Sequence, residues 1–207
     1  MDPLKSPSAM GKKIYKLLER KKILRLQDKI FPNIVGEITG ETIRGSWWSH
    51  PLANPIYNGL GWLEHHHPIL IVKLIDGKVT YLHDSLASDF FSIVCEPRQW
   101  QLEKLKADEV ELFKYIYKKK KVTSEDLNLK KLAKDPKKSL SSLEKKLLLC
   151  ASEEHTESGK HIKEYTSWKN SKYAACEIKD YLVAHKNITT LVEKLSRDSG
   201  AKVRLPW

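Results

Sequence analysis

Apolar side chains recur every three or four positions along much of this 207-residue chain, which is the spacing of one helix face. The strongest run covers residues 107–120. The same spacing predicts further helices over residues 12–24, 26–38, 51–64, 84–95, 139–149 and 170–197. Pro32 weakens the second of these, because proline interrupts a helix, and a break is expected near Asn187 in the last.

A different pattern predicts two β-hairpins. The segment ILIVKLI at 69–75 is rich in β-branched residues, and Asp76-Gly77 separates it from KVTYLH at 78–83. Asp-Gly is favoured in two-residue hairpin turns. A second hairpin is expected from 148–155 and 161–168 around Ser158-Gly159, and residues 201–207 are expected to form a short strand. The sequence therefore predicts a mostly helical α+β fold with small β-hairpins.

Three short helices followed by a hairpin occur twice, over roughly 11–83 and 106–168, without shared sequence. This order resembles a winged-helix domain. The residues that carry the resemblance are the 51–64 helix with LIDGKVTYLH, then VTSEDL, the 139–149 helix and HTESGKHIK. The resemblance implies two winged-helix-like modules, at 1–96 with 84–95 as a joining helix, and at 97–207 with C-terminal helices that brace the second module.

Three strings, GSWWSHP, VKLIDGKVTYLH and HTESGKHIKEYTSW, are also similar to those of a bacterial protein family. This second resemblance implies no particular activity and supplies no catalytic residue.

Charge narrows the range of partners. The chain carries 37 Lys and Arg against 26 Asp and Glu, a net charge of +11. The excess lies in residues 1–36 and 101–146, whereas residues 37–100 carry more acidic than basic side chains. A basic surface commonly binds nucleic acid, anionic membrane or an acidic protein. Three cysteines, no long apolar run and a polar N-terminus lead us to expect a soluble cytoplasmic protein, associated with the nucleoid if it binds DNA.

The winged-helix resemblance implies that the third helix of a module enters the major groove of double-stranded DNA while the hairpin contacts the backbone. Lysines supply phosphate contacts, asparagine can recognise adenine, and tryptophan can stack on an unpaired base. The candidate DNA-binding residues of the second module are Lys137, Lys138, Ser141, Ser142, Lys145, Lys160, His161 and Lys163. Those of the first are Trp47, Trp48, His50, Asn54, Asn58, Lys73 and Lys78.

Simpler roles remain open for these residues. A run of lysines is commonly a solvated helix face, and adjacent tryptophans before a helix commonly belong to the core. Three consecutive histidines, 65–67, cannot all face one metal from a regular helix, and no phosphate-binding glycine motif occurs. We therefore expect no metal and no cofactor.

Two other functions also remain open. A nucleic-acid-processing enzyme, either a hydrolase or DNA glycosylase-like, could use His155, Glu157 and His161, or Gln99-Trp100-Gln101. That tripeptide is similar to a Gln-x-Gln motif of bacterial alkyl-base glycosylases built from tandem winged helices. A protein–protein adaptor would leave the lysines unused. The function that the sequence favours is non-catalytic binding of double-stranded DNA, as a transcription regulator or chromosome-associated protein.

Overall fold

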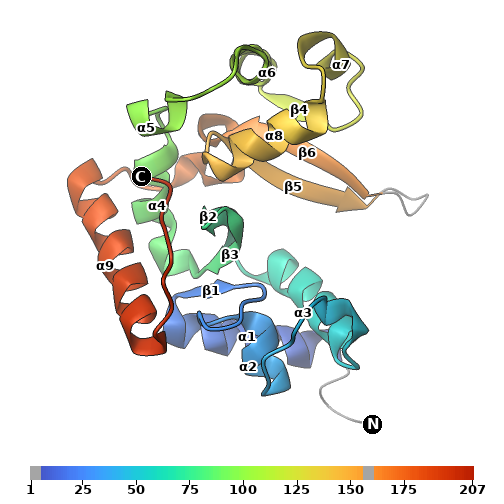
Figure 1. The fold of residues 1–207 in the computed structure, drawn as a ribbon, viewed down its shortest axis with the longest axis vertical. Coiled ribbons are helices and arrows are strands. Elements are labelled where there is room, and N and C mark those ends of the chain that lie inside the picture. The colour runs from blue at the N-terminus through green and yellow to red at the C-terminus, as the bar shows by residue number, and fades with distance from the viewer. Residues whose placement is uncertain (1–5, 156–160) are drawn as a thin grey trace.

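Two groups of helices, each closed by a three-stranded antiparallel sheet, follow one another along the chain (Figure 1). The computed structural model describes residues 6–155 and 161–207. The first group, here the N-module, contains α1 (Pro7–Lys21), β1 (Ile23–Arg25), α2 (Ile34–Thr39), α3 (Ala53–His66), β2 (Leu70–Ile75) and β3 (Lys78–Leu82). The second, here the C-module, contains α6 (Ala107–Lys119), β4 (Lys121–Thr123), α7 (Leu129–Leu132), α8 (Pro136–Lys145), β5 (Leu149–His155) and β6 (His161–Ser167).

The remaining elements join or cover the modules. Among the described residues they are α4 (Ala87–Val94), α5 (Gln99–Leu102), α9 (Tyr181–Ser199) and four short 3-10 turns, Trp47–Ser49, Asp84–Leu86, Trp168–Asn170 and Lys172–Ala175. The predicted α+β class, mostly helical with small antiparallel sheets, is therefore confirmed.

Both modules have the element order helix, strand, helix, helix, strand, strand, and in both sheets the last strand lies in the middle. Leu24 pairs with Tyr81 in the N-module, and Val122 pairs with Tyr165 in the C-module. The two predicted hairpins are confirmed as β2–β3 and β5–β6. The predicted helix over residues 12–24 extends too far, since residues 23–24 belong to β1, and the sequence predicts no strand at the position of β4.

Local signals explain where α8 begins and ends. Pro136 occupies its first turn, and the Asp135 carboxylate accepts a hydrogen bond from the Lys138 N–H at 3.1 Å. Both are favoured at a helix start. Leu147 has a φ of 53°, which a helix cannot accommodate. The predicted helix over 139–149 was therefore placed too late, because its last residues belong to a turn and to β5.

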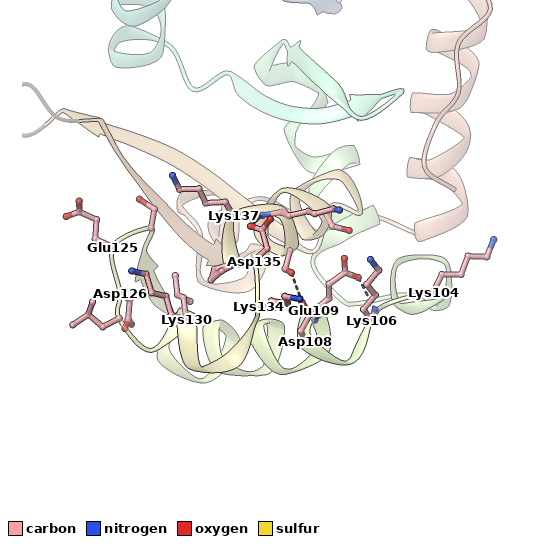
Figure 2. Close-up of a pocket in the computed structure, with 17 residues that line it drawn as sticks. Lys104, Lys106, Asp108, Glu109, Glu125, Asp126, Lys130, Lys134, Asp135 and Lys137 are labelled. Carbon is pink, nitrogen blue, oxygen red and sulfur yellow. Dashed lines mark hydrogen bonds between the residues drawn. The ribbon is translucent and has the colours of Figure 1, made fainter.

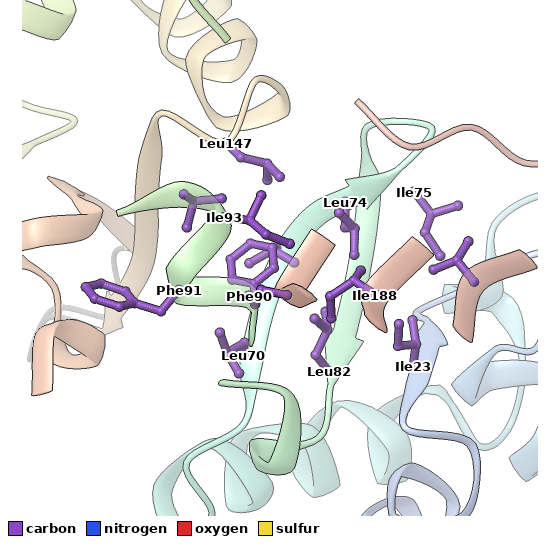
Figure 3. Close-up of a cluster of buried hydrophobic side chains, with 14 of the residues drawn as sticks. Ile23, Leu70, Leu74, Ile75, Leu82, Phe90, Phe91, Ile93, Leu147 and Ile188 are labelled. Carbon is purple, nitrogen blue, oxygen red and sulfur yellow. The ribbon is translucent and has the colours of Figure 1, made fainter. Parts of the chain in front are cut away.

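Each module has its own apolar cluster, and a third cluster is shared. Figure 3 shows this shared cluster, in which Leu74 of β2, Phe90 and Ile93 of α4, Ile188 of α9 and Leu147 beside the C-module lie together. The C-terminal helix α9 thus packs against α4 and the first sheet. The sequence had instead predicted that the C-terminal helices pack against the second module.

The C-terminal end of the chain differs from its predictions in two further ways. Helix α9 continues through Asn187, whose side-chain amide donates a hydrogen bond to Asp89 at 3.4 Å, so no break occurs there. Residues 201–207 are extended but form no strand. Their backbone is tied to the β2–β3 turn, because the Asp76 N–H donates to the Arg204 carbonyl at 2.9 Å.

Candidate nucleic-acid interface

Helix α8 is the third helix of the C-module and carries five of the predicted DNA-binding residues. Leu140 and Leu143 are buried in the C-module cluster. Lys138, Ser142 and Lys145 follow one another at spacings of four and three residues, which places them on one side of the helix. Both lysines of this row are exposed and Ser142 is half-buried. The polar side of α8 is therefore open to solvent over most of its length.

A groove of about 990 Å³ lies at the N-terminal end of α8 (Figure 2). Six exposed lysines contribute to its lining: Lys104, Lys106, Lys130, Lys134, Lys137 and Lys138. We call this surface the lysine groove. None of these six ammonium groups forms an ion pair with a carboxylate whose side chain the structure describes. They come from the α5–α6 connection, from α7 and the α7–α8 connection, and from α8, which tertiary packing brings together.

The groove also contains five carboxylates, and most of them serve the fold. Asp108 accepts a hydrogen bond from the Ser139 hydroxyl at 2.8 Å, and buried Glu109 accepts one from the Lys106 N–H at 3.0 Å. Hydrogen bonds from the Asn128 backbone N–H and the Tyr115 hydroxyl lower the pKa of Asp126. Because these acids are held against the protein while the lysines extend outwards, the cations are the better placed groups for an anionic partner.

The other end of α8 contacts the N-module hairpin. Lys73 Nζ on β2 lies 2.6 Å from Glu144 Oε2 and donates to the Ser141 hydroxyl at 3.2 Å. The aliphatic part of Lys145 packs on the β2–β3 turn, where a Cβ built on Gly77 would lie 3.1 Å from Lys145 Cγ. Predicted DNA-binding residues Lys73 and Ser141 are therefore engaged in joining the two modules, which leaves them poorly available for phosphate.

Lys78, also on the N-module hairpin, has a different environment. Its side chain is 60% exposed, and its ammonium group lies 3.7 Å from Asp28. The Asp28 carboxylate is already bound by Arg25 and by two backbone N–H groups. Lys78 is thus loosely paired and accessible to an anionic partner.

A cleft of about 740 Å³ separates α3 and the N-module sheet from β5 of the C-module. We call it the inter-module cleft. Trp48, Tyr57 and Trp62 line it, together with polar Asn58 and the Lys73–Glu144 pair. Trp48 is 54% exposed and Tyr57 is 37% exposed, although both are large apolar side chains. The surface is therefore aromatic and partly open, and its lining carries two lysines and two glutamates.

The residues predicted around the tryptophan pair separate into different roles. Trp47 is 6% exposed in the N-module cluster and lies at the edge of the cleft lining, whereas Trp48 stacks on it with ring centroids 4.4 Å apart and faces outwards. His50 Nδ1 accepts the Leu52 N–H at 3.0 Å and thereby supports the start of α3. Asn54 and Asn58 are both exposed on α3, and Asn58 lines the cleft.

The predicted residues of the second hairpin are placed only in part. Lys163 on β6 lines the inter-module cleft. The backbones of His155 and His161 pair at the ends of β5 and β6. The side chains of both histidines, and Glu157 and Lys160 entirely, lie outside the described residues.

The Gln-x-Gln segment has a structural role. Gln101 is fully buried, and its amide N–H donates to the carbonyls of Lys146 and Leu147 at 3.2 and 2.7 Å. Its amide oxygen accepts the Arg98 N–H at 2.8 Å. With all these hydrogen bonds made internally, Gln101 cannot reach a substrate. The resemblance of this tripeptide to the glycosylase motif therefore does not extend to its environment.

Other reactive side chains are similarly engaged. Burial raises the pKa of Cys150 to about 12, which keeps the thiol protonated and unreactive at neutral pH. His66 stacks on Trp62 at 4.2 Å and His67 on Tyr15 at 3.7 Å. In the part of the chain that the structure describes, no three His, Cys, Asp or Glu side chains gather as metal ligands. Among its described helices, none is long and apolar enough to span a membrane.

Comparisons with protein-family models, with curated proteins and with solved structures found no match for this chain. The sequence and the geometry described above are therefore the basis of the functional proposal.

Proposed function

We propose that this protein binds double-stranded DNA, without catalysis, through two winged-helix-like modules. The observation that carries the proposal is the combination of a repeated topology with unpaired lysines on the third helix of the second module. The two parts support each other, because the fold supplies a helix that can enter a groove of DNA and the lysines supply contacts to phosphate.

The topology supports the winged-helix interpretation. A winged helix presents its third helix and its terminal hairpin on one side, where the helix enters the major groove and the hairpin follows the backbone. In the C-module these elements are α8 and β5–β6, and in the N-module α3 and β2–β3. The order of strands in both sheets places the hairpin beside the first strand, as this interpretation requires.

The charge distribution supports a larger share of the affinity for the C-module than for the N-module. The lysine groove ends at α8, and Lys138 and Lys145 continue the positive charge along the helix. Lysines that reach phosphates release counterions from DNA, so binding through them weakens steeply as salt rises. The exposed side of α3 instead offers amides and aromatic rings. We therefore assign phosphate contacts to α8 and base contacts to α3.

A titration with charge variants tests the proposal. The variant Lys134→Ala/Lys137→Ala/Lys138→Ala removes three charges from the lysine groove and should weaken binding to a random duplex of about 20 base pairs. Each lost phosphate contact lowers the slope of log K against log salt by roughly 0.9. Fluorescence anisotropy over a range of salt concentrations measures both quantities.

The matched control is Lys186→Ala/Lys194→Ala/Lys202→Ala, which removes three exposed lysines from α9 and the segment after it. This variant should bind the duplex as the wild type does. An equal loss in both variants would show that only net charge matters and would reject the lysine groove as the interface. Absence of any binding by the wild type at low salt would reject DNA binding and would favour a protein partner instead.

A further inference from the structure

We propose that the inter-module cleft binds one unpaired, unstacked nucleobase, so that the protein prefers DNA containing an unpaired base to a fully paired duplex. This inference rests on the proposed DNA binding and deepens it by assigning a second site with a different ligand chemistry. The argument starts from Trp48.

Trp48 forms a prepared stacking surface. One face of its indole ring lies on buried Trp47, with ring centroids 4.4 Å apart and an angle of 26° between the planes. The Ser46 hydroxyl accepts the Trp48 N–H at 3.4 Å, which helps to fix the turn. With 54% of its surface exposed, Trp48 presents a large apolar area to solvent and not to the protein core. Planar bases stack on such rings irrespective of their sequence.

The surroundings of Trp48 fit a base better than an aliphatic ligand. Tyr57 lies 5.3 Å from Trp48 at an angle of 53°, so it forms a second aromatic wall. Exposed Asn58 follows Tyr57 on α3 and offers both an amide donor and an amide acceptor, the pair that recognises the edge of a base. The volume of about 740 Å³ lies within the usual range of small-ligand sites.

The charges explain why the base, and not the phosphate, would occupy the cleft. Two lysines, Lys73 and Lys163, and two glutamates, Glu64 and Glu144, line the cleft, so its formal charges balance. Lys73 is paired with Glu144, and these two side chains are only 19% and 10% exposed. Lys138 and Lys145 are exposed along α8, which spans about 15 Å at 1.5 Å per residue and runs from the lysine groove to the cleft. A backbone bound along α8 would therefore deliver a displaced base to the aromatic side of the cleft.

The test compares two probes of the same sequence, a fully paired 20-base-pair duplex and a duplex with one bulged, unpaired base at its centre. Wild-type protein should bind the bulged probe about tenfold more tightly, since stacking of one base on an aromatic side chain is worth that much or more. Trp48→Ala should lose this preference and retain its affinity for the paired duplex. Trp48→Phe should retain much of the preference, because it keeps an aromatic surface.

The control is Leu182→Ala, which removes an exposed apolar side chain of α9 outside the cleft and should leave the preference unchanged. Thermal unfolding of each variant identifies any that fails to fold. If Trp48→Ala does not fold, the affinities of Trp48→Phe for the bulged and the paired probe are compared with those of the wild type. Equal affinity of the wild type for the two probes would overturn the cleft proposal while leaving DNA binding intact. Failure to bind either probe would overturn both, and a loss in Trp48→Ala that is equal for both probes would make Trp48 a duplex contact.

Discussion

The side chain of a single residue, Gln101, connects the start of α5 to the turn after α8, which lies 45 residues further along the chain. Its side chain hydrogen-bonds Arg98 in the segment before α5 and the carbonyls of Lys146 and Leu147 after α8. The Leu147 carbonyl also accepts the indole N–H of Trp168 at 2.9 Å. Because the side chain is fully buried, water cannot replace these partners.

The variant Gln101→Met tests whether this residue is structural. Methionine has a similar length but removes the hydrogen bonds to the partly buried Arg98 backbone N–H and to the Lys146 and Leu147 carbonyls, which should lower the free energy of unfolding by about 2 kcal/mol. Urea denaturation measures the loss, and Gln99→Met, a change at an exposed position, is the control. A catalytic role would predict the reverse, with stability preserved and turnover of a damaged base abolished.

The tryptophan pair shows that the sequence does not predict which of two adjacent, identical residues is buried. Trp47 and Trp48 are adjacent and chemically identical, and the sequence predicted both as DNA contacts. In the 3-10 turn Trp47–Ser49, neighbouring side chains point in different directions, so one ring is buried and the other exposed. Which of the two lies inside depends on how the turn docks against the N-module core.

At the scale of elements, α1 and α3 cross with little space between them. A Cβ built on Gly59 would lie 2.5 Å from Met10 Cγ, and one built on Gly11 would lie 2.2 Å from Trp62 Cε3. Both distances are shorter than any real contact between carbon atoms. The close approach of α1 and α3 therefore requires a glycine in each helix, Gly11 in α1 and Gly59 in α3. Gly61 is only two residues from Gly59 in the same helix, yet a Cβ there would meet nothing within 4 Å.

This difference gives a matched pair of substitutions. Gly59→Ala should lower the free energy of unfolding by about 1–3 kcal/mol, because the added methyl overpacks the helix crossing. Gly61→Ala should raise it by about 0.5–1 kcal/mol, because alanine is the better helix former and the site is open. Thermal or urea denaturation measures both. Similar effects in the two variants would show that helix propensity, and not the crossing, governs this region.

Some elements with a clear pattern were predicted within one residue, whereas the predicted bounds of the long helices α1 and α9 were displaced and the shortest strands were missed. Residues 107–120 and the Asp76-Gly77 hairpin matched α6 and β2–β3 within one residue at each end. The three-residue strands β1 and β4 are too short to show alternation, and they exist because β3 and β6 supply their hydrogen-bond partners. Apolar residues 147–149 extended the apparent period of α8, although the positive φ of Leu147 ends the helix.

The candidate site was predictable only where it lies on one element. Lys137, Lys138 and Lys145 follow from the pattern of a single helix. The lysine groove also needs Lys104, Lys106, Lys130 and Lys134, which reach it from two other segments. Spacing along the chain carries no information on such convergence, because it depends on how α6 and α7 pack against α8. The aromatic wall of Tyr57 and Trp62 was missed for the same reason, since only docking of the modules creates the cleft.

At the scale of the whole molecule, the two modules share part of one core. The shared cluster, part of which is shown in Figure 3, combines the N-module sheet with α4, α9 and Leu147. Trp168 belongs to the same cluster. The Lys73–Glu144 pair and the hydrogen bonds of Gln101 connect the same regions. Such continuity is expected to make unfolding of the modules cooperative, because opening one module would expose apolar surface on the other.

Ile188→Ala tests this cooperativity from a helix outside both modules. Ile188 is fully buried in the shared cluster, so its truncation should cost about 2–5 kcal/mol. Native-state hydrogen exchange should then accelerate by similar factors in α1 of the N-module and α6 of the C-module, whereas Leu182→Ala, on the exposed side of α9, should change neither. Acceleration confined to one module would show that the modules unfold independently. In that case the inter-module cleft would depend on docking between separate domains, and its affinity for an unpaired base would include the free energy of that docking.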